Sequence, residues 1–146
     1  MIHVFEELFA RAGTSLDDEL VVTPAETLAR HFWSDGSRLD LFTDLDRSRE
    51  AIRVFAGERE ADAFIKFHRY AERIYQSVSD IFIFADKPSP LKMMAKMGPS
   101  IAPRMLHADV HRRMWSSICR HFKDERLRQL FGRYATYSGN NPFKTP

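Results

Sequence analysis

The hydrophobic positions along this chain follow two periods, and together they predict a mostly helical protein with one β-hairpin. Apolar residues recur every three to four positions at 2–12, 45–55, 58–84, 110–122 and 125–137, the spacing of one face of an α-helix. The tail after these segments, SGNNPFKTP, has the composition of turns. We therefore expect an α+β fold in which helices dominate.

The segment 27–43 is predicted to form an antiparallel β-hairpin. Asp35 and Gly36 at its centre favour a two-residue type I′ turn, in which both residues have positive φ. A lone hairpin is marginal in water, so it needs partner strands, and 20–22 is the one short candidate in this chain. The predicted cross-strand pairs are Phe32–Leu39, Trp33–Arg38, His31–Asp40 and Arg30–Leu41, with Leu28, Phe32, Leu39 and Leu41 facing the core.

Capping residues set the expected helix ends. Asp44 or Asp46 precedes the helix at 45–55, and Gly57 follows it. Asp109 and Asp124 stand before the last two helical segments, where a carboxylate can accept hydrogen bonds from the first free N–H groups.

Composition narrows the class of protein. Hydrophobic residues make up 44% of the chain and charged residues 29%, which is typical of a folded domain and too apolar for disorder. No stretch approaches the ~18 apolar residues of a membrane-spanning helix. The single cysteine, Cys119, rules out an internal disulfide and is typical of a reducing compartment.

The formal net charge of +2 conceals two halves of opposite sign. Residues 1–86 hold 10 Lys and Arg against 17 Asp and Glu, whereas residues 87–146 hold 12 against 3. This asymmetry indicates either attraction between the halves or a basic surface for an anionic partner. Nucleic acid is not the expected partner, because no recognition motif is present and the aromatic residues lie on predicted core stripes.

No cofactor or metal site is predicted within the chain. A dinucleotide-binding loop needs closely spaced glycines, and the six glycines stand far apart, at 13, 36, 57, 98, 132 and 139. His107 and His111 have a spacing that can place two imidazoles on one helix face, but no third metal ligand accompanies them.

The stretch 88–115 combines methionines with lysines and arginines, and it allows two interpretations. Methionine fills irregular cores, but it also suits irregular apolar ligands, and flanking lysines reach lipid phosphates. The residues predicted to contact a membrane are Lys92, Met93, Met94, Lys96 and Met97.

Three segments resemble the phytoene-desaturase-like family of flavoproteins, and most of all its hydroxy- and methoxyneurosporene-type carotenoid desaturases. They are VFEELFARAG at 4–13, WSDGSRLDLFTDLDRSREAIRVFAGEREADAFIKF at 33–67 and LRQLFGRYATYSGNNPF at 127–143. The resemblance implies a two-lobed enzyme that introduces double bonds into C40 polyenes by hydride transfer to FAD. The FAD-binding lobe is absent from this chain.

The same resemblance implies an arrangement of the chain. Residues 1–56 would belong to the substrate-binding lobe, 57–123 to a helical, membrane-facing lid, and 124–146 to a return toward the substrate lobe. Phe131, Tyr134 and Tyr137, which share a helix face, would line the polyene tunnel, although they are equally consistent with ordinary core packing. No catalytic residue is carried over.

The expected partners are a carotenoid, a membrane surface and the remainder of the same polypeptide, at the inner membrane of a bacterium on its cytoplasmic side. The isolated chain is expected to be inactive. Two alternatives remain open: a non-catalytic helical binding or scaffold module, and a flavin enzyme of the amine-oxidase type with another apolar substrate.

Overall fold

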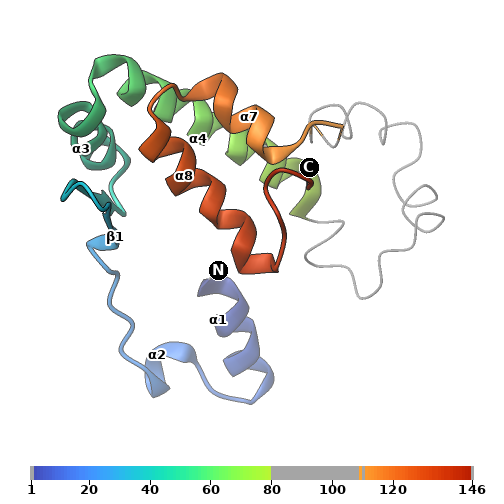
Figure 1. Cartoon of the computed structure of the whole chain (residues 1–146). Coiled ribbons are helices and arrows are strands. Elements are labelled where there is room, and N and C mark those ends of the chain that lie inside the picture. Colours follow the sequence, from blue (N-terminus) through green and yellow to red (C-terminus); the bar gives the residue numbers. More distant parts are fainter. Residues whose placement is uncertain (1, 80–108, 110, 146) are drawn as a thin grey trace.

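The computed structural model describes residues 2–79, 109 and 111–145. Within these ranges the fold is mostly helical with one antiparallel two-stranded sheet, as predicted. Two parts can be distinguished: an N-terminal arm, residues 2–25, and a body formed by the remaining described residues (Figure 1).

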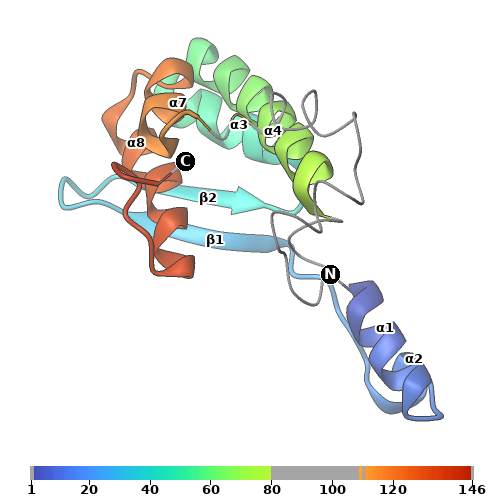
Figure 2. The same cartoon turned by 90° about the vertical axis from the view of Figure 1, so that its right-hand side faces the viewer.

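The N-terminal arm contains α1 (Ile2–Arg11) and α2 (Leu16–Glu19), followed by an extended connection to the hairpin. Gly13, with φ of 85°, ends the first helix as predicted, and the Ser15 hydroxyl accepts the N–H of Asp18 to cap the second. The predicted strand at 20–22 is wrong, because these residues have no regular secondary structure and the sheet of the described residues contains only β1 and β2. In Figure 2 the arm extends away from the body.

The hairpin consists of β1 (Thr27–Phe32) and β2 (Arg38–Phe42), but its turn differs from the prediction. Gly36 has φ of 82°, whereas Asp35 does not have a positive φ, which excludes a type I′ turn. The Asp35 carboxylate instead accepts the N–H of Ser37, and the N–H of Trp33 donates to the carbonyl of Ser37. A three-residue loop with glycine at its positive-φ position therefore closes the hairpin.

The longer loop shifts the register by one residue, so the predicted pairs are wrong. His31 lies opposite Leu39, Arg30 opposite Asp40 and Phe32 opposite Arg38, with an irregularity between Thr27 and Ala29. A one-residue shift exchanges the faces of a strand. On β1 the core face therefore carries His31, and Leu28 and Phe32 are exposed.

The helices α3 (Leu45–Ala56) and α4 (Glu58–Val78) follow the predicted caps. Asp44 accepts the N–H of Arg47 at the start of α3, and Gly57, at φ of 93°, separates the two helices. The predicted extension of the second helix to 84 lies outside the described residues.

The helix α7 (Met114–His121) begins four residues later than predicted, and Asp109 does not cap it. Asp109 has a left-handed backbone, and its carboxylate binds the side chains of Tyr70 and Arg112. The first N–H groups of α7, those of Met114 and Trp115, donate to the carbonyls of Thr145 and Pro142. The C-terminal tail thus caps α7 through its backbone, a role that its sequence did not suggest.

The helix α8 (Glu125–Gly132) begins as predicted at Asp124, whose carboxylate accepts two backbone N–H groups. It ends earlier than predicted and continues as the 3-10 helix η3 (Arg133–Ser138). At the junction, a Cβ on Gly132 would lie 3.1 Å from the Trp115 ring, so glycine permits the close approach of α7 to α8.

The core lies in the body, between the hairpin and the helices α3, α4, α7 and α8 (Figure 2). Ile52, Ile118, Phe122 and Leu127 are fully enclosed. By contrast, α1 contains no buried residue. No described helix has the length and apolar content needed to cross a membrane.

Candidate functional site: an apolar cleft over an aromatic cluster

An apolar cleft of about 430 Å³ opens beside the core, between the hairpin and the helices. This volume lies within the range of about 300–1,000 Å³ typical of ligand-binding pockets. The hairpin, α3, α4, α7, α8 and η3 all contribute to its walls. Prominent lining residues are Leu28, Phe42, Phe67, His68, Met114 and Tyr134.

The deep side of the cleft is an aromatic cluster from α4, α8 and Phe122, the residue that follows α7. Phe131 of α8 stacks on Phe122, with ring centroids 4.7 Å apart and planes 13° apart. Phe67 and Phe64 of α4 lie 5.0 and 6.1 Å from the Phe131 ring. These rings hold one another in place by packing, so the cleft has a preformed apolar wall.

Few polar groups face the cleft. The Ser48 hydroxyl is engaged with both backbone groups of Phe42, and the Thr43 hydroxyl donates to the carbonyl of Ala25. The side chains of His68 and Tyr134 bring the remaining polar atoms. An apolar wall with isolated polar groups has the character of a site for a hydrophobic molecule and offers little specific recognition of charge.

The structure brings together two of the three residues that the resemblance assigned to substrate binding. Phe131 and Tyr134 both line the cleft. Tyr137 does not line it; its side chain is 75% exposed, and its ring lies 5.6 Å from that of Tyr134. Tyr137 therefore lies outside the cleft, beside Tyr134.

Several lining residues were not predicted as site residues. Phe64 and Phe67 were expected to be core, and their helical spacing gave no means of separating a cleft wall from an ordinary core stripe. Phe42 was not singled out at all. The residues predicted to contact a membrane, Lys92, Met93, Met94, Lys96 and Met97, lie outside the described residues.

A polar cluster joins α4 to α7 beside the core. The Tyr70 hydroxyl lies 2.8 Å from Oδ2 of Asp109 and 3.1 Å from the Ser117 hydroxyl. Burial raises the pKa of Tyr70, so it stays a neutral hydrogen-bond donor. Within the described ranges, no three His, Cys, Asp or Glu side chains form a group that could hold a metal ion.

The predicted His31–Asp40 surface pair is not formed, because the register shift separates the two side chains. His31 is buried, its Nε2 has no hydrogen-bond partner, and burial, followed by the nearby Arg133, lowers its pKa. Asp40 instead lies between Arg30 and Arg38, and their hydrogen bonds hold the pKa of its carboxyl far below the usual range. His31 thus acts as a neutral core residue.

Comparison with known proteins finds enzymes that match nearly the whole length of this chain. The chain is 42% identical over its whole length to a hydroxyneurosporene desaturase of Rhodobacter capsulatus and 39% identical, over 98% of its length, to that of Rubrivivax gelatinosus. It is 31% identical, over 97% of its length, to a phytoene dehydrogenase of Streptomyces griseus. It spans 29%, 27% and 27% of these relatives. No family model matches the chain.

Proposed function

We propose that this chain, which its similarities place in the phytoene-desaturase-like family of carotenoid desaturases, is the substrate-lobe and lid segment of such an enzyme. The observation that carries the proposal is the 42% identity over the whole chain to a hydroxyneurosporene desaturase. The complete polypeptide would introduce double bonds into an acyclic C40 carotenoid.

The apolar cleft is the proposed place for part of the polyene. Among the described residues, its aromatic wall and its lack of ion pairs suit a long hydrocarbon. Burial of such a molecule is favourable by about 25 cal/mol for each Å² of apolar surface removed from water. Phe131 would form the deep wall and Tyr134 the side wall. Tyr137, which lies outside the cleft beside Tyr134, would contact the part of the polyene that leaves the cleft. These roles are binding and positioning, and we assign no catalytic group to the chain.

A flavin does not fit the residues of this chain. No two glycines are close enough to form a phosphate-binding loop, and the described sheet has two antiparallel strands rather than the parallel strands of a dinucleotide-binding unit. FAD, as the family resemblance implies it, would be held by other parts of a two-lobed polypeptide. We therefore assign no flavin contact to this chain.

An active chimera tests this proposal. The chain would replace the matching segment of the Rhodobacter capsulatus desaturase, and conversion of hydroxyneurosporene would be followed by chromatography. We expect turnover from the chimera. A folded but inactive chimera would instead favour a scaffold module, and activity on amines alone would favour an amine-oxidase type of enzyme.

Substitution of two tyrosines with similar exposed fractions tests whether the polyene of that chimera lies in the cleft. Tyr134 lines the cleft and Tyr75 does not, yet their exposed fractions are similar, 43% and 49%. Tyr134→Asp would place a charge against the polyene and should lower kcat/KM roughly tenfold or more, chiefly through KM, because an unpaired charge in an apolar site costs at least about 1.4 kcal/mol. Tyr75→Asp should change it less than about twofold. Equal effects of the two changes would remove the polyene from this cleft.

Membrane association is a separate part of the proposal and rests on composition. Lys92 and Lys96 flank Met93 and Met94, and Met97 follows Lys96, so the segment contains apolar and cationic side chains together. Lys92→Glu/Lys96→Glu should reduce binding to anionic vesicles and leave the weak binding to neutral vesicles unchanged. The proposed location, peripheral on the cytoplasmic side of a bacterial inner membrane, would be abandoned if both proteins bound anionic vesicles equally.

A further inference from the structure

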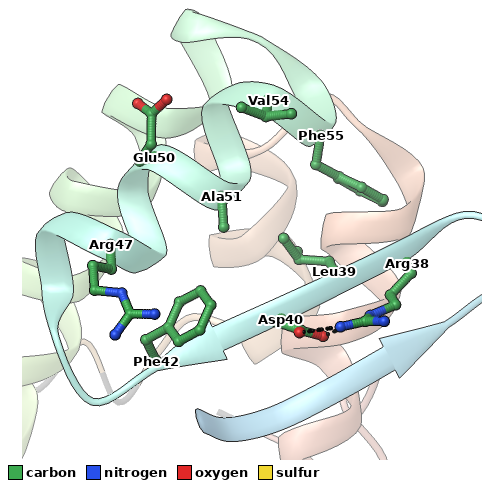
Figure 3. A pocket seen from close by; sticks show the side chains of 9 residues that line it. All are labelled: Arg38, Leu39, Asp40, Phe42, Arg47, Glu50, Ala51, Val54 and Phe55. Carbon is green, nitrogen blue, oxygen red and sulfur yellow. Dashed lines mark hydrogen bonds and ion pairs between the residues drawn. The ribbon is translucent and has the colours of Figure 1, made fainter. Parts of the chain in front are cut away.

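A second hollow, of about 510 Å³, runs along the outer edge of β2 (Figure 3). Arg38, Leu39 and Asp40 all line it, although neighbouring residues of a strand point to opposite faces of the sheet. A hollow touched by three consecutive residues must therefore follow the strand edge. No residue of β1 lines it, so it lies on the side of β2 away from its partner.

The backbone groups of β2 that face this hollow can be identified from one contact. Both the N–H and the C=O of Phe42 bind the hydroxyl of Ser48 on α3, so they point away from β1. In an antiparallel strand this direction alternates from residue to residue. The N–H and C=O groups of Asp40 and Arg38 therefore point the same way, and within the described residues no backbone group pairs with them.

The helix α3 forms the opposite wall of this hollow. Ala51, Val54 and Phe55 give that wall an apolar surface, and the side chain of Val54 is 74% exposed. The charged side chains at the rim, Arg38, Asp40, Arg47 and Glu50, balance in number. A groove with unpaired backbone groups on one side and an apolar helix on the other has the features of a site for β-strand addition.

We propose that this β2–α3 groove receives an extended strand from the remainder of the same polypeptide, which pairs with Arg38 and Asp40 and packs alternate side chains on Val54 and Phe55. The proposal rests on the proposed function in one respect, that the chain is a segment of a larger enzyme. This chain spans 29% of the Rhodobacter capsulatus protein, so most of that relative's polypeptide lies outside the matching segment and could provide such a strand. A two-stranded sheet is marginal alone, and a third strand would stabilise it.

Hydrogen exchange of the Arg38 and Asp40 amides tests the proposal. The 146-residue chain would be compared with its chimera with the Rhodobacter capsulatus desaturase. In the chimera, both amides should exchange at least about tenfold more slowly, because a hydrogen-bonded strand edge opens less often. The outward amide of Arg30, on the edge of β1, should change less than about threefold. Unchanged β2 amides, or protection of the β1 edge alone, would overturn the proposal.

A proline at the strand edge provides the matched variant. Arg38→Pro removes an N–H that points away from β1, so it blocks strand addition while the β1–β2 ladder keeps its hydrogen bonds. Arg38→Ala removes the same side chain but keeps the N–H. We expect protection of the Asp40 amide in the chimera to survive Arg38→Ala and to fall to the level of the 146-residue chain with Arg38→Pro. Equal protection in both variants would contradict strand addition.

The same measurements distinguish strand addition from self-association and from failure of the proposed function. Concentration-dependent protection of the Arg38 and Asp40 amides in the 146-residue chain would assign the groove to a second copy and overturn the proposed occupant. A chimera that lacks desaturase activity but protects these two amides would contradict the proposed function alone. An active chimera with unprotected amides would contradict strand addition alone.

Discussion

The body and the N-terminal arm of this chain are both built from amphipathic segments, yet they bury very different amounts of surface. In the body, the apolar faces of four helices and a hairpin converge on Ile52, Ile118 and Phe122, which are fully enclosed. In the arm, Ile2, Phe5 and Leu8 form an equally regular stripe on α1, and each is at least half exposed. Amphipathic spacing therefore predicts a helix, but it does not provide the partner that makes the helix stable.

The largest expected difference between the body and the arm comes from replacing one phenylalanine of each region with alanine. Phe122 is fully buried and stacked on Phe131, so Phe122→Ala should lower the free energy of unfolding by about 3–5 kcal/mol. Phe5 is 53% exposed, and Phe5→Ala should change that free energy by less than about 0.5 kcal/mol. Urea unfolding followed by fluorescence measures this, since both tryptophans, Trp33 and Trp115, lie in the body. Similar losses in both variants would show that the arm folds as part of the body.

A smaller contrast comes from the two helix caps. Asp124 accepts two backbone N–H groups at the start of α8, and Asp124→Ala should cost about 1 kcal/mol in the same measurement. Ser15 makes the equivalent contact at the start of α2, but Ser15→Ala should leave the unfolding of the body unchanged. A loss of stability from Ser15→Ala as large as that from Asp124→Ala would mean that the arm is coupled to the core.

The smallest expected effect is a pH dependence confined to the body. Burial lowers the pKa of His31, so below the unfolded value of about 6.5 the unfolded chain binds more protons than the folded one. The part of the stability that depends on His31 is therefore fully present above about pH 6.5 and is lost as the pH falls through the lower folded pKa. His31→Leu should remove this part of the dependence between about pH 8 and pH 5, whereas His3→Gln in the arm should retain it. The measurement is the urea midpoint of unfolding at several pH values. If the midpoint of His31→Leu changed with pH as much as that of the unaltered chain, the dependence could not be assigned to His31.

The parts of the fold that sequence could predict are those determined by contacts between near neighbours. Gly57 and Asp124 end or begin helices through groups within three or four residues, as predicted, and Asp44 is the one of its two predicted candidates that caps α3. The hairpin itself was also predicted. Its register was not, because Asp35 binds the N–H of Ser37 and leaves Gly36 alone at positive φ. That one local choice moved His31 from the predicted surface to the core.

The candidate site was less predictable, because its walls come from segments far apart in the chain. Phe131 and Tyr134 could be proposed from a family resemblance, but Phe42 and Phe67 enter the cleft only once the hairpin and α4 have packed. A helical stripe of apolar residues looks the same in sequence whether it meets another helix or borders an open cleft. Tyr137 shows the converse, since it shares the spacing of Tyr134 and lies outside the cleft.

The C-terminal tail has a consequence that reaches the cleft. The carbonyl of Thr145 accepts the N–H of Met114, and the side chain of Met114 forms part of the cleft wall. A ligand that binds only when this wall is in place must also favour the docked tail, and docking of the tail must strengthen that ligand to the same degree. The described tail residues, 141–145, are thus thermodynamically linked to whatever fills the cleft, although none of them lines it.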